Sequence, residues 1–399
     1  GNIWQLAYFN FGQDSSFAGT KTAQGNTDGN GNGDFYYAVP TGHLALCSAN
    51  LPEPTIGPNS ATQSDDHFDT LLYTGNNEVA QDIGGLEFKP DWVWIKGRSY
   101  SDHHAIFDSS RGVGRILYSN GNYTDDSAVN TLDEFRSDGF GVGTDAGAGL
   151  VNTDSNTYVA WNWKANGGTT SSNSDGSITS TVQANTDAGF SIVLYTGTGS
   201  AGTVGHGLGV APTMIIFKNR STTDNWMIYN KDNGNTNAVF LNLTNANSTS
   251  NTFINSTTPS STVFNLATVT NNNGSGNSIV AYCFADVEGY SKFGSYTGNG
   301  STDGTFVYTG FRPAWIMFKR TDSTNHWLML DNKRDVDNPV HKFVLANESS
   351  SEDTSNDQDT DFTSNGFKVR NSNARNNASG GSYIYMAFAE APFKYANGR

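Results

Sequence analysis

The chain has 399 residues, of which 44 are glycine and only 15% are charged, and its formal net charge is −15. A chain of this length is too long to fold around a single hydrophobic core. Its acidic net charge would repel a phosphate backbone, which argues against a nucleic-acid partner. Abundant Gly, Asn, Ser and Thr favour short strands joined by tight turns, and no apolar run is long enough for membrane insertion. We therefore expect an extended, all-β protein of several domains.

The first 58 residues lie outside the internal repeat of the remaining chain and read as the C-terminal part of a separate β-domain. They start at Gly1 rather than Met and show no export signal, so we expect that an N-terminal part is missing. Residues 26–34 alternate oxygen-bearing side chains with glycine, which partly resembles a calcium-binding turn but lacks its closing Glu. A plain turn without a cofactor is favoured; the ligands of the alternative, a calcium site, would be Asp28, Asn30, Asn32 and Asp34.

A threefold repeat organises the rest of the chain. Residues 68–75 recur at 190–197 and, with more changes, at 291–298. The spacings are 122 residues from the first Tyr of this motif to the second and 101 from the second to the third, and they hold without a gap through the following strands. We predict three modules, residues 59–167, 168–288 and 289–399. The repeated positions are Tyr73, Tyr195 and Tyr296; Pro90, Pro212 and Pro313; Lys96, Lys218 and Lys319; and Asp108, Asn230 and Asp331.

Each repeat predicts the same series of strands. Tyr-Thr-Gly ends one strand, and a Pro then starts a second strand whose two faces are both apolar, so this strand should be central and covered on both sides. A polar hairpin, a return strand and a closing aromatic strand complete an antiparallel, jelly-roll-like β-sandwich. The central strands should place Trp94, Ile216 and Met317 at one equivalent core position, and Ile95, Phe217 and Phe318 at another.

The joins between modules differ in composition. Residues 167–187 are rich in Gly, Ser and Thr and read as a linker, whereas the boundary near Glu288 is short, so the second and third modules should pack rigidly. The stretch 134–140 resembles 361–367, but its spacing has grown by four residues relative to the earlier motifs, which indicates a loop insertion in the third module.

The repeated polar residues offer little for catalysis. A glycosidase needs two facing carboxylates, but the recurring acid of the first and third modules is Asn230 in the second. We therefore interpret Asp108, Asn230 and Asp331 as turn caps at strand ends, and the repeated lysines as groups that solvate the sandwich rims. On this view Asp108→Asn would leave binding nearly unchanged, and Trp94→Ala would unfold the first module.

Other candidate ligands are better read as core residues. His103 and His104 could bind a metal, but His104 aligns with Trp226 and Trp327, which indicates packing. Cys47 and Cys283 each lie in an apolar run and are expected to be buried thiols rather than a disulfide. Several tryptophans could stack on sugars, but their strand positions favour the core: Trp92, Trp94, Trp161, Trp163, Trp226, Trp315 and Trp327.

Two stretches of the first domain, residues 10–13 (Asn-Phe-Gly-Gln) and 44–54, resemble the end of the SPRY-like, concanavalin-type domain of tailed-bacteriophage structural proteins, especially marine and cyanobacterial ones. His43 stands where that family usually has an aromatic residue. The repeats resemble the modules that follow this domain in such proteins. The motifs are Pro-Asp-Trp-Val-Trp-Ile-Lys at 90–96, Asp-Ser-x-Arg-Gly at 108–112 and Ser-Asp-Gly-Phe at 137–140.

This resemblance implies a bacteriophage virion structural protein, placed on the particle as a tail fibre or receptor-binding appendage that adheres to host-surface polysaccharide or lipopolysaccharide. Its partners would be other virion proteins and further copies of itself in a homotrimer, since closed symmetry is the norm for homo-oligomers. We expect binding without enzymatic activity. The alternatives are a tail-spike depolymerase that hydrolyses or lyses polysaccharide, a capsid-attached decoration fibre, and a secreted bacterial adhesin.

Overall fold

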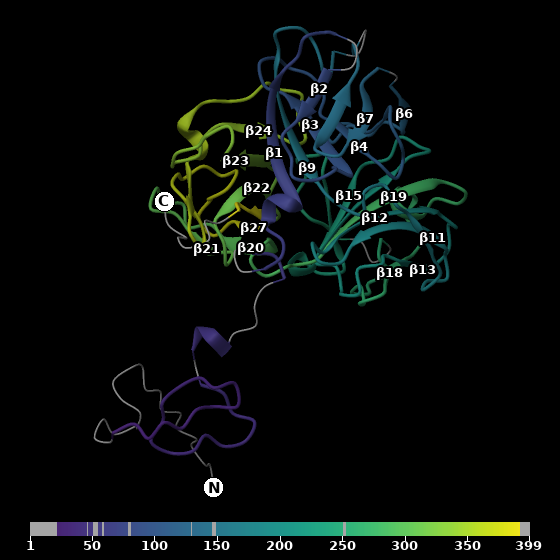
Figure 1. The fold of residues 1–399 in the computed structure, drawn as a ribbon. Helices are drawn as coiled ribbons and strands as arrows, with labels where there is room; N and C mark the ends of the chain where they lie inside the picture. The colour runs from purple at the N-terminus through teal and green to yellow at the C-terminus, as the bar shows by residue number, and fades with distance from the viewer. Residues whose placement is uncertain are drawn as a thin grey trace. The chain divides into compact units, whose positions relative to one another are not determined.

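The computed structural model describes residues 22–45, 47–50, 55–57, 60–78, 81–128, 130–145, 149–249 and 253–391. The chain divides into two compact units, Gly1–Glu53 and Pro54–Arg399 (Figure 1). The division precedes the predicted boundary at residue 58, because Ile56 is fully buried in the core of the second unit. In the described part of the first unit, the regular structure is a bridge from Asn26 to Phe35 and the short helix η1 (Ser48–Asn50). The motif at residues 10–13 lies outside the described residues.

Three large antiparallel sheets share one strand order in the second unit. Each begins with the strand that ends in Tyr-Thr, followed in space by the closing aromatic strand, the central strand and the return strand. The three sheets are β1 (Phe68–Thr74), β9 (Thr157–Trp163), β3 (Trp92–Gly97) and β4 (Ala105–Asp108); β12 (Phe190–Thr196), β19 (Ser278–Phe284), β14 (Met214–Asn219) and β15 (Met227–Asn230); and β20 (Ser291–Thr297), β27 (Ser382–Ala389), β22 (Pro313–Arg320) and β23 (Trp327–Asp331).

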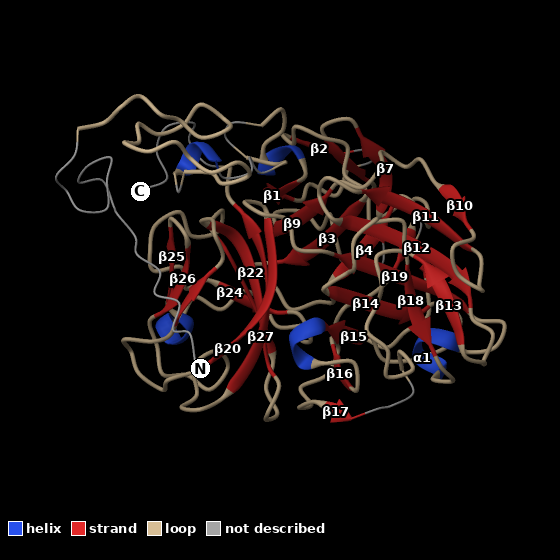
Figure 2. Ribbon diagram, turned by 90° about the horizontal axis from the view of Figure 1, so that it is seen from below, coloured by secondary structure: helices blue, strands red, loops and turns tan. Residues whose placement is uncertain are grey.

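Further strands extend two of these sheets, as Figure 2 shows by secondary structure. The second sheet gains β10 (Ser171–Asn173) and β11 (Ser180–Asn185) at one edge, so the predicted linker at 167–187 is wrong. The Ser and Thr residues of this segment are compatible with strands near a sheet edge, and Val182 in β11 is buried. The remaining additions are β16 (Asn237–Phe240) and β17 (Ser248–Thr249) in the second sheet and β24 (Phe343–Leu345) in the third.

A smaller sheet faces each large one and completes a sandwich. These sheets are β2 (Gln81–Gly84), β8 (Gly139–Val142) and β7 (Leu132–Arg136); β13 (Gly202–Gly205) and β18 (Val263–Leu266); and β21 (Phe306–Tyr308), β26 (Gly366–Val369) and β25 (Thr360–Thr363). The other short elements are β5 (Arg115–Ile116), β6 (Asp126–Ser127), η2 (Ser64–Asp66), η3 (Lys231–Asn233), η4 (Asn356–Gln358) and α1 (Thr270–Asn273). The prediction of an all-β protein made of antiparallel sheets is confirmed. None of the helices in the described segments has the length and apolar character to cross a membrane.

The central strands explain how the sandwiches fit together. Ile95, Phe217 and Phe318 each lie in a separate core between the two sheets of one sandwich. Trp94, Ile216 and Met317, one residue earlier, all lie in a single core that the three sandwiches share. Both faces of each central strand are therefore covered, one by its own module and one by the other two. We call these sandwiches modules 1, 2 and 3, with the residue ranges predicted above.

The shared core is aromatic. Trp92 of module 1 packs on Trp163 at 4.4 Å and on Tyr282 of module 2 at 4.7 Å between ring centroids, and Trp163 contacts Trp315 of module 3 at 5.7 Å. The seven tryptophans considered as sugar contacts are all buried, which confirms the packing interpretation. Because the three modules meet in one core, the expectation of an extended row of modules is wrong: residues 54–399 form one compact unit.

The two cysteines differ. Cys283 is fully buried, as predicted, and burial raises the pKa of its thiol. Cys47 is only partly buried, so the prediction fails for this residue. Both are free thiols.

Candidate functional site

The repeated lysines join neighbouring modules. Lys96 Nζ donates to Ser349 O of module 3 over 3.2 Å, Lys218 Nζ to Asn122 O of module 1 over 3.2 Å, and Lys319 Nζ to Thr244 O of module 2 over 3.0 Å. Each lysine also donates to a carbonyl of its own module. All three are fully buried, so the prediction that they solvate the sandwich rims is wrong. Burial lowers the pKa of each lysine to about 8.

A second set of contacts follows the same cycle. Trp226 Nε1 donates to Tyr118 O of module 1 over 2.8 Å, and Trp327 Nε1 donates to Phe240 O of module 2 over 2.9 Å. His104 takes the equivalent place in module 1, and its Nε2 lies 3.0 Å from Leu345 O of module 3. The imidazole is fully buried, and burial holds its pKa well below the usual value, so the ring is neutral. The interpretation of His104 as a packing residue is confirmed.

Three interfaces result: the first joins modules 1 and 2, the second joins modules 1 and 3, and the third joins modules 2 and 3. In each, one module supplies two backbone carbonyls and the other supplies the lysine and the ring nitrogen. The cycle closes, because every module is donor to one neighbour and acceptor for the other. The repeat therefore encodes a ring of three modules within one chain.

The first interface contains a buried ion-pair network. Asp108 Oδ1 accepts the backbone N–H of Arg111 and caps the turn, as predicted, while Oδ2 pairs with the Arg111 guanidinium and accepts a 2.7 Å hydrogen bond from Tyr282 of module 2. The Arg111 guanidinium also pairs with Asp125 over 3.2 Å, and Asp125 pairs with Arg220 of module 2 over 2.6 Å. The side chains of Asp108 and Arg111 are completely buried.

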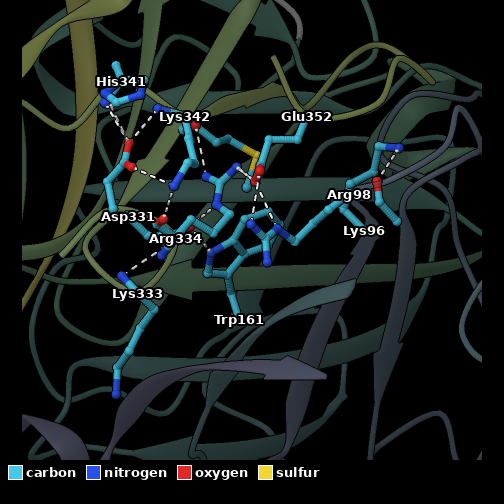
Figure 3. A network of polar contacts seen from close by, with 12 residues as sticks. Lys96, Arg98, Trp161, Asp331, Lys333, Arg334, His341, Lys342 and Glu352 are labelled. Atoms are coloured by element: carbon cyan, nitrogen blue, oxygen red, sulfur yellow. Dashed lines mark hydrogen bonds and ion pairs between the residues drawn. The ribbon is translucent and has the colours of Figure 1, made fainter. Parts of the chain in front are cut away.

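The second interface repeats this network (Figure 3). Asp331 Oδ1 caps its turn by accepting from Arg334 N, and Oδ2 accepts from Arg334 Nε over 2.5 Å and from Trp161 Nε1 of module 1 over 3.1 Å. Arg334 contacts Glu352 over 3.3 Å, and Arg98 of module 1 holds the same carboxylate through two hydrogen bonds of 2.9 Å. Burial alone would raise the pKa of Glu352, but the hydrogen bond from Arg98 and the charge of Arg334 hold it below its usual value.

The third interface has the same positions without charge. Asn230 Oδ1 caps the turn by accepting from Asp232 N and Asn233 N, and Asn247 Nδ2 donates to Asn233 Oδ1 over 2.6 Å. Three buried atoms here have no partner in the described structure: Asn230 Nδ2, Asn233 Nδ2 and Asn247 Oδ1. This arrangement leaves polar groups unsatisfied where the other interfaces have ion pairs.

Strand pairing identifies the missing donors of the third interface. Trp161 pairs with Trp94, Tyr282 with Ile216 and Met386 with Met317, so Met386 occupies the place of the two ring donors. Thr321 likewise lies two residues after its lysine, where modules 1 and 2 have an arginine. Five positions thus change together in the third interface. The Tyr or Trp donor is replaced by Met386, the Asp by Asn230, and the Arg three residues later by Asn233. The Asp or Glu partner is replaced by Asn247, and the Arg that follows the lysine by Thr321.

The repeated Tyr-Thr-Gly ends act within modules. Tyr73, Tyr195 and Tyr296 donate their hydroxyls to the carbonyls of Val151, Asn272 and Asn376 over 2.8, 2.6 and 2.6 Å. A Cβ on the following glycine would lie only 2.3 or 2.4 Å from a backbone oxygen, so no larger residue fits; the glycines are Gly75, Gly197 and Gly298. Pro313 starts β22, and Pro90 and Pro212 lie two residues before β3 and β14.

Sequence reasoning missed the arginines and their acidic partners. Arg111 and Arg334 each follow their aspartate by three residues, a spacing visible in the Asp-Ser-x-Arg-Gly motif. Asp125 and Glu352 could also have been matched, because the four-residue insertion already inferred for module 3 brings them into register. The ring donors could not have been assigned, since nothing in the strand pattern shows which module they would face.

The loop considered for calcium has an internal hydrogen-bond network in the first unit. Asp28 accepts four N–H donors, the backbone amides of Asn30, Asn32 and Ala45 and the side chain of Asn50, at 2.6 to 2.9 Å. The hydrogen bond from Ala45 is the main cause that lowers the pKa of Asp28 to about 2. Asp34 accepts from Gly25 N over 2.8 Å. A calcium site here stays a prediction; within the described segments no three His, Cys, Asp or Glu side chains gather as a metal site would require.

Comparison with known proteins places these features in a family. No curated protein and no solved structure matches the sequence. A family model described as a domain of unknown function, DUF7483, matches residues 63–392. This span covers module 2 entirely, nearly all of modules 1 and 3, and all three interfaces, so the family unit corresponds to the ring rather than to one sandwich. The chain therefore belongs to the DUF7483 family.

Proposed function

We propose that the chain is a structural and adhesive component of a bacteriophage virion, part of a tail fibre or receptor-binding appendage, and that it binds host-surface glycan without catalysis. The virion assignment rests on the resemblance of the first domain and of the repeat motifs to tailed-phage structural proteins. The geometry of the second unit bears on how such a component would work. The observation that supports the proposal is the closed ring of buried contacts between modules.

A closed ring suits a rigid element that presents loops. Every module is held by both neighbours through buried lysines, ring nitrogens and a common aromatic core, so the modules should not move independently. Function then falls to the exposed loops and outer sheet faces, as is usual when a rigid scaffold carries a binding surface. Several weak glycan contacts on many copies of such a unit would give strong adhesion.

Binding is favoured over a depolymerase by the state of the repeated carboxylates. Asp108 and Asp331 are the recurring acids that a glycosidase could have used, but both are fully buried and paired with an arginine. A catalytic acid must reach the glycosidic oxygen, and these two carboxylates are shielded from any substrate. Their recurrence is accounted for by the interfaces.

The homotrimer remains part of the proposal, on a changed basis. Exposed aromatic side chains give it little support, because most large aromatic side chains of the described residues lie in the cores. Threefold packing of sandwiches already occurs within one chain, so any trimer would use a different surface. Light scattering of the full chain tests this point, and a monodisperse monomer at micromolar concentration would argue against a trimer.

Location on the particle is the decisive test of the proposed function. Antibodies raised against the full 399-residue chain should label purified phage particles in immunogold electron microscopy. Gold at the tail or its fibres supports the receptor-binding role, and gold spread over the capsid supports the decoration fibre instead. Particles of the source phage that carry no label would refute the virion assignment.

Activity is tested in parallel. The purified chain should compete with phage particles for adsorption to host cells while producing no new reducing ends or unsaturated sugars from host polysaccharide. Turnover that a single Asp or Glu substitution abolishes would establish the depolymerase alternative.

A further inference from the structure

Two aromatic side chains of module 3 project from the outer sheet instead of entering a core. Phe306 and Tyr308 on β21 are 45% and 67% exposed, whereas Val307 between them is buried in the module core. Alternate residues of a strand point to the same face, so both rings lie on the outer face, about 7 Å apart along the strand. β21 is an edge strand of its sheet, which leaves this face accessible from the side.

The fold does not require these rings. Val307 pairs with Phe367, just as Ile83 pairs with Phe140 in module 1 and Val204 with Phe264 in module 2, so the three edge strands can be compared residue by residue. The flanking residues are Asp82 and Gly84 in module 1 and Thr203 and Gly205 in module 2. Since the same sandwich forms with those small or polar residues, Phe306 and Tyr308 are surplus to packing.

The surroundings of the two rings are polar, and their charges cancel. Lys368 lies opposite Phe306 on β26 and pairs with Asp303 over 2.8 Å. Asp361 on β25 lies opposite Lys368 and is 3.4 Å from Arg370. The face therefore combines two apolar rings with two cations and two anions already in pairs.

The strand opposite the second ring has no side chain beside it. Gly366 stands opposite Tyr308 and has no side chain, and a Cβ there would lie 2.0 Å from Val307 O. Thr363, opposite Gly366, is partly buried and bonds to the backbone carbonyl of Gly366. One side of the Tyr308 ring is thus bordered by backbone rather than by a side chain.

We propose that Phe306 and Tyr308 form a platform for a neutral polysaccharide chain. The C–H face of a pyranose packs on an aromatic face, whose electrons attract the partly positive C–H hydrogens. Rings on alternate strand positions are spaced comparably to the length of a sugar ring, so neighbouring units of one chain can contact them in turn. Ring hydroxyls would bond to the flanking Lys368, Arg370, Asp303 and Asp361 groups.

Charge selects the neutral chain over an acidic one. The platform has no excess positive charge, and the protein as a whole carries −15, which would repel a polyanionic glycan. This inference rests on the proposed function, whose ligand class it narrows to neutral pyranose polymers bound by module 3. A strand of a second copy added to β21 is the competing occupant, and the experiment separates the two.

The test substitutes both rings with the residues that module 2 carries at the same positions. Phe306→Thr/Tyr308→Gly should preserve the fold, which thermal unfolding checks, because the sandwich of module 2 tolerates these residues. The matched control is Val210→Thr, which removes an apolar side chain that is 50% exposed on module 2. Migration of the full chain is measured in native gels that contain dextran, amylose, mannan or soluble cellulose derivatives, with dextran sulfate as the acidic probe.

We expect the wild-type chain to be retarded by at least one neutral polysaccharide and not by dextran sulfate. The double variant should bind about tenfold more weakly, as loss of central aromatic contacts does, and the control should match wild type. A double variant that binds like wild type would overturn the platform but leave glycan adhesion standing. Wild-type chain that no neutral polysaccharide retards would overturn the inference, whereas virion location is decided separately by immunogold labelling.

Light scattering of the same proteins tests the competing occupant. The platform predicts that wild type and double variant have the same mass. A mass that falls only in the double variant, with glycan binding unchanged, would assign the two rings to a contact between copies and refute the platform.

Discussion

The hydroxyl of Tyr282 in module 2 donates a 2.7 Å hydrogen bond to Asp108 in module 1, and both side chains are fully buried. The same relation recurs between Trp161 and Asp331 in the second interface. In the third interface Met386 replaces the ring donor, and Asn230 replaces the aspartate. A donor, its acceptor and the neighbouring arginines are thus present together or absent together, which indicates that each network acts as one unit.

Removing the charge of Asp108 alone should be costly. Asp108→Asn keeps the turn cap but leaves the buried Arg111 without its nearest counter-charge, so we expect a loss of about 3 kcal/mol in the free energy of unfolding. The expectation from the sequence, that binding would be nearly unchanged, considered only the cap and did not concern stability. Urea unfolding measures the loss, and the exposed Asp126→Asn serves as the control, with about 0.5 kcal/mol or less expected. Equal values for the two variants would show that Arg111 does not need Asp108.

Replacing the whole network should cost less than breaking it. The triple variant Asp108→Asn/Arg111→Asn/Tyr282→Met gives the first interface the residues of the third at three of the five positions, and it leaves Asp125 paired with Arg220. The triple variant removes the buried guanidinium together with its counter-charge, whereas Asp108→Asn leaves the guanidinium without its nearest counter-charge, so the triple variant should be the more stable of the two. Urea unfolding of the single, triple and wild-type chains decides this. A triple variant less stable than the single one would mean that the three positions are not coupled.

The third interface should open most readily. Equivalent backbone amides cross the three interfaces: Asp125 N to Arg220 O at 3.0 Å, Glu352 N to Arg98 O at 3.0 Å, and Asn247 N to Thr321 O at 2.8 Å. Local opening exposes such amides to exchange, and an amide exchanges faster the less stable its contact is. Because the third interface has no ion pair at the network positions next to this amide, Asn247 N should exchange fastest in native-state hydrogen exchange, despite its shorter hydrogen bond. Equal rates at all three amides would contradict this ranking.

The strand pattern explains why the core could be predicted and its partner could not. The double apolar character of the central strand indicated that Trp94 and Ile95 would both be covered, and both are. Apolar periodicity gives the burial of each face but not the identity of what covers it. In the structure the face of Trp94 is covered by modules 2 and 3.

The lysines show the same limit for polar residues. Lysine is rarely fully buried, so the composition of the repeat favoured an exposed position for Lys96. Its acceptor, Ser349 O, is a backbone carbonyl in a loop of another module. Every residue has such a carbonyl, so the sequence does not show which one accepts the hydrogen bond. The recurrence of lysine three times in register was the available signal, since a solvated rim position would not need one residue type.

The buried lysines should make stability depend on pH. Burial lowers the pKa of Lys96, Lys218 and Lys319 to about 8, compared with 10.5 for an exposed lysine. Between these values the unfolded chain binds more protons than the folded one, so the free energy of unfolding should rise with pH from about 8 to about 10. The urea midpoint measured across this range checks the rise, and Lys96→Met should reduce its slope by about a third. A falling midpoint between pH 8 and 10 would contradict the assignment.

The same profile should reverse at higher pH. Burial raises the pKa of Tyr73, Tyr195 and Tyr296 well above 10.0, so the unfolded chain loses these protons first. The folded state then binds more protons than the unfolded one, and the free energy of unfolding falls above about pH 10. Tyr296→Phe should weaken this fall relative to wild type, at the cost of its hydrogen bond to Asn376 O.

Trp94→Ala tests whether the modules unfold together. Trp94 is completely buried in the shared core and donates to His104 Nδ1 over 2.9 Å, so its truncation should cost about 3–5 kcal/mol. The sequence alone suggested that module 1 would then unfold by itself. Because Trp94 lies in a core with Ile216 and Met317, the loss should instead lower one common transition for residues 54–399.

Differential scanning calorimetry checks this by comparing the calorimetric enthalpy of that transition with the van't Hoff enthalpy. The matched control is Leu72→Ala on β1, whose side chain is 42% exposed and which should shift the midpoint little. A Trp94→Ala scan with two transitions, only one of them displaced, would show that the shared aromatic core does not couple the three modules.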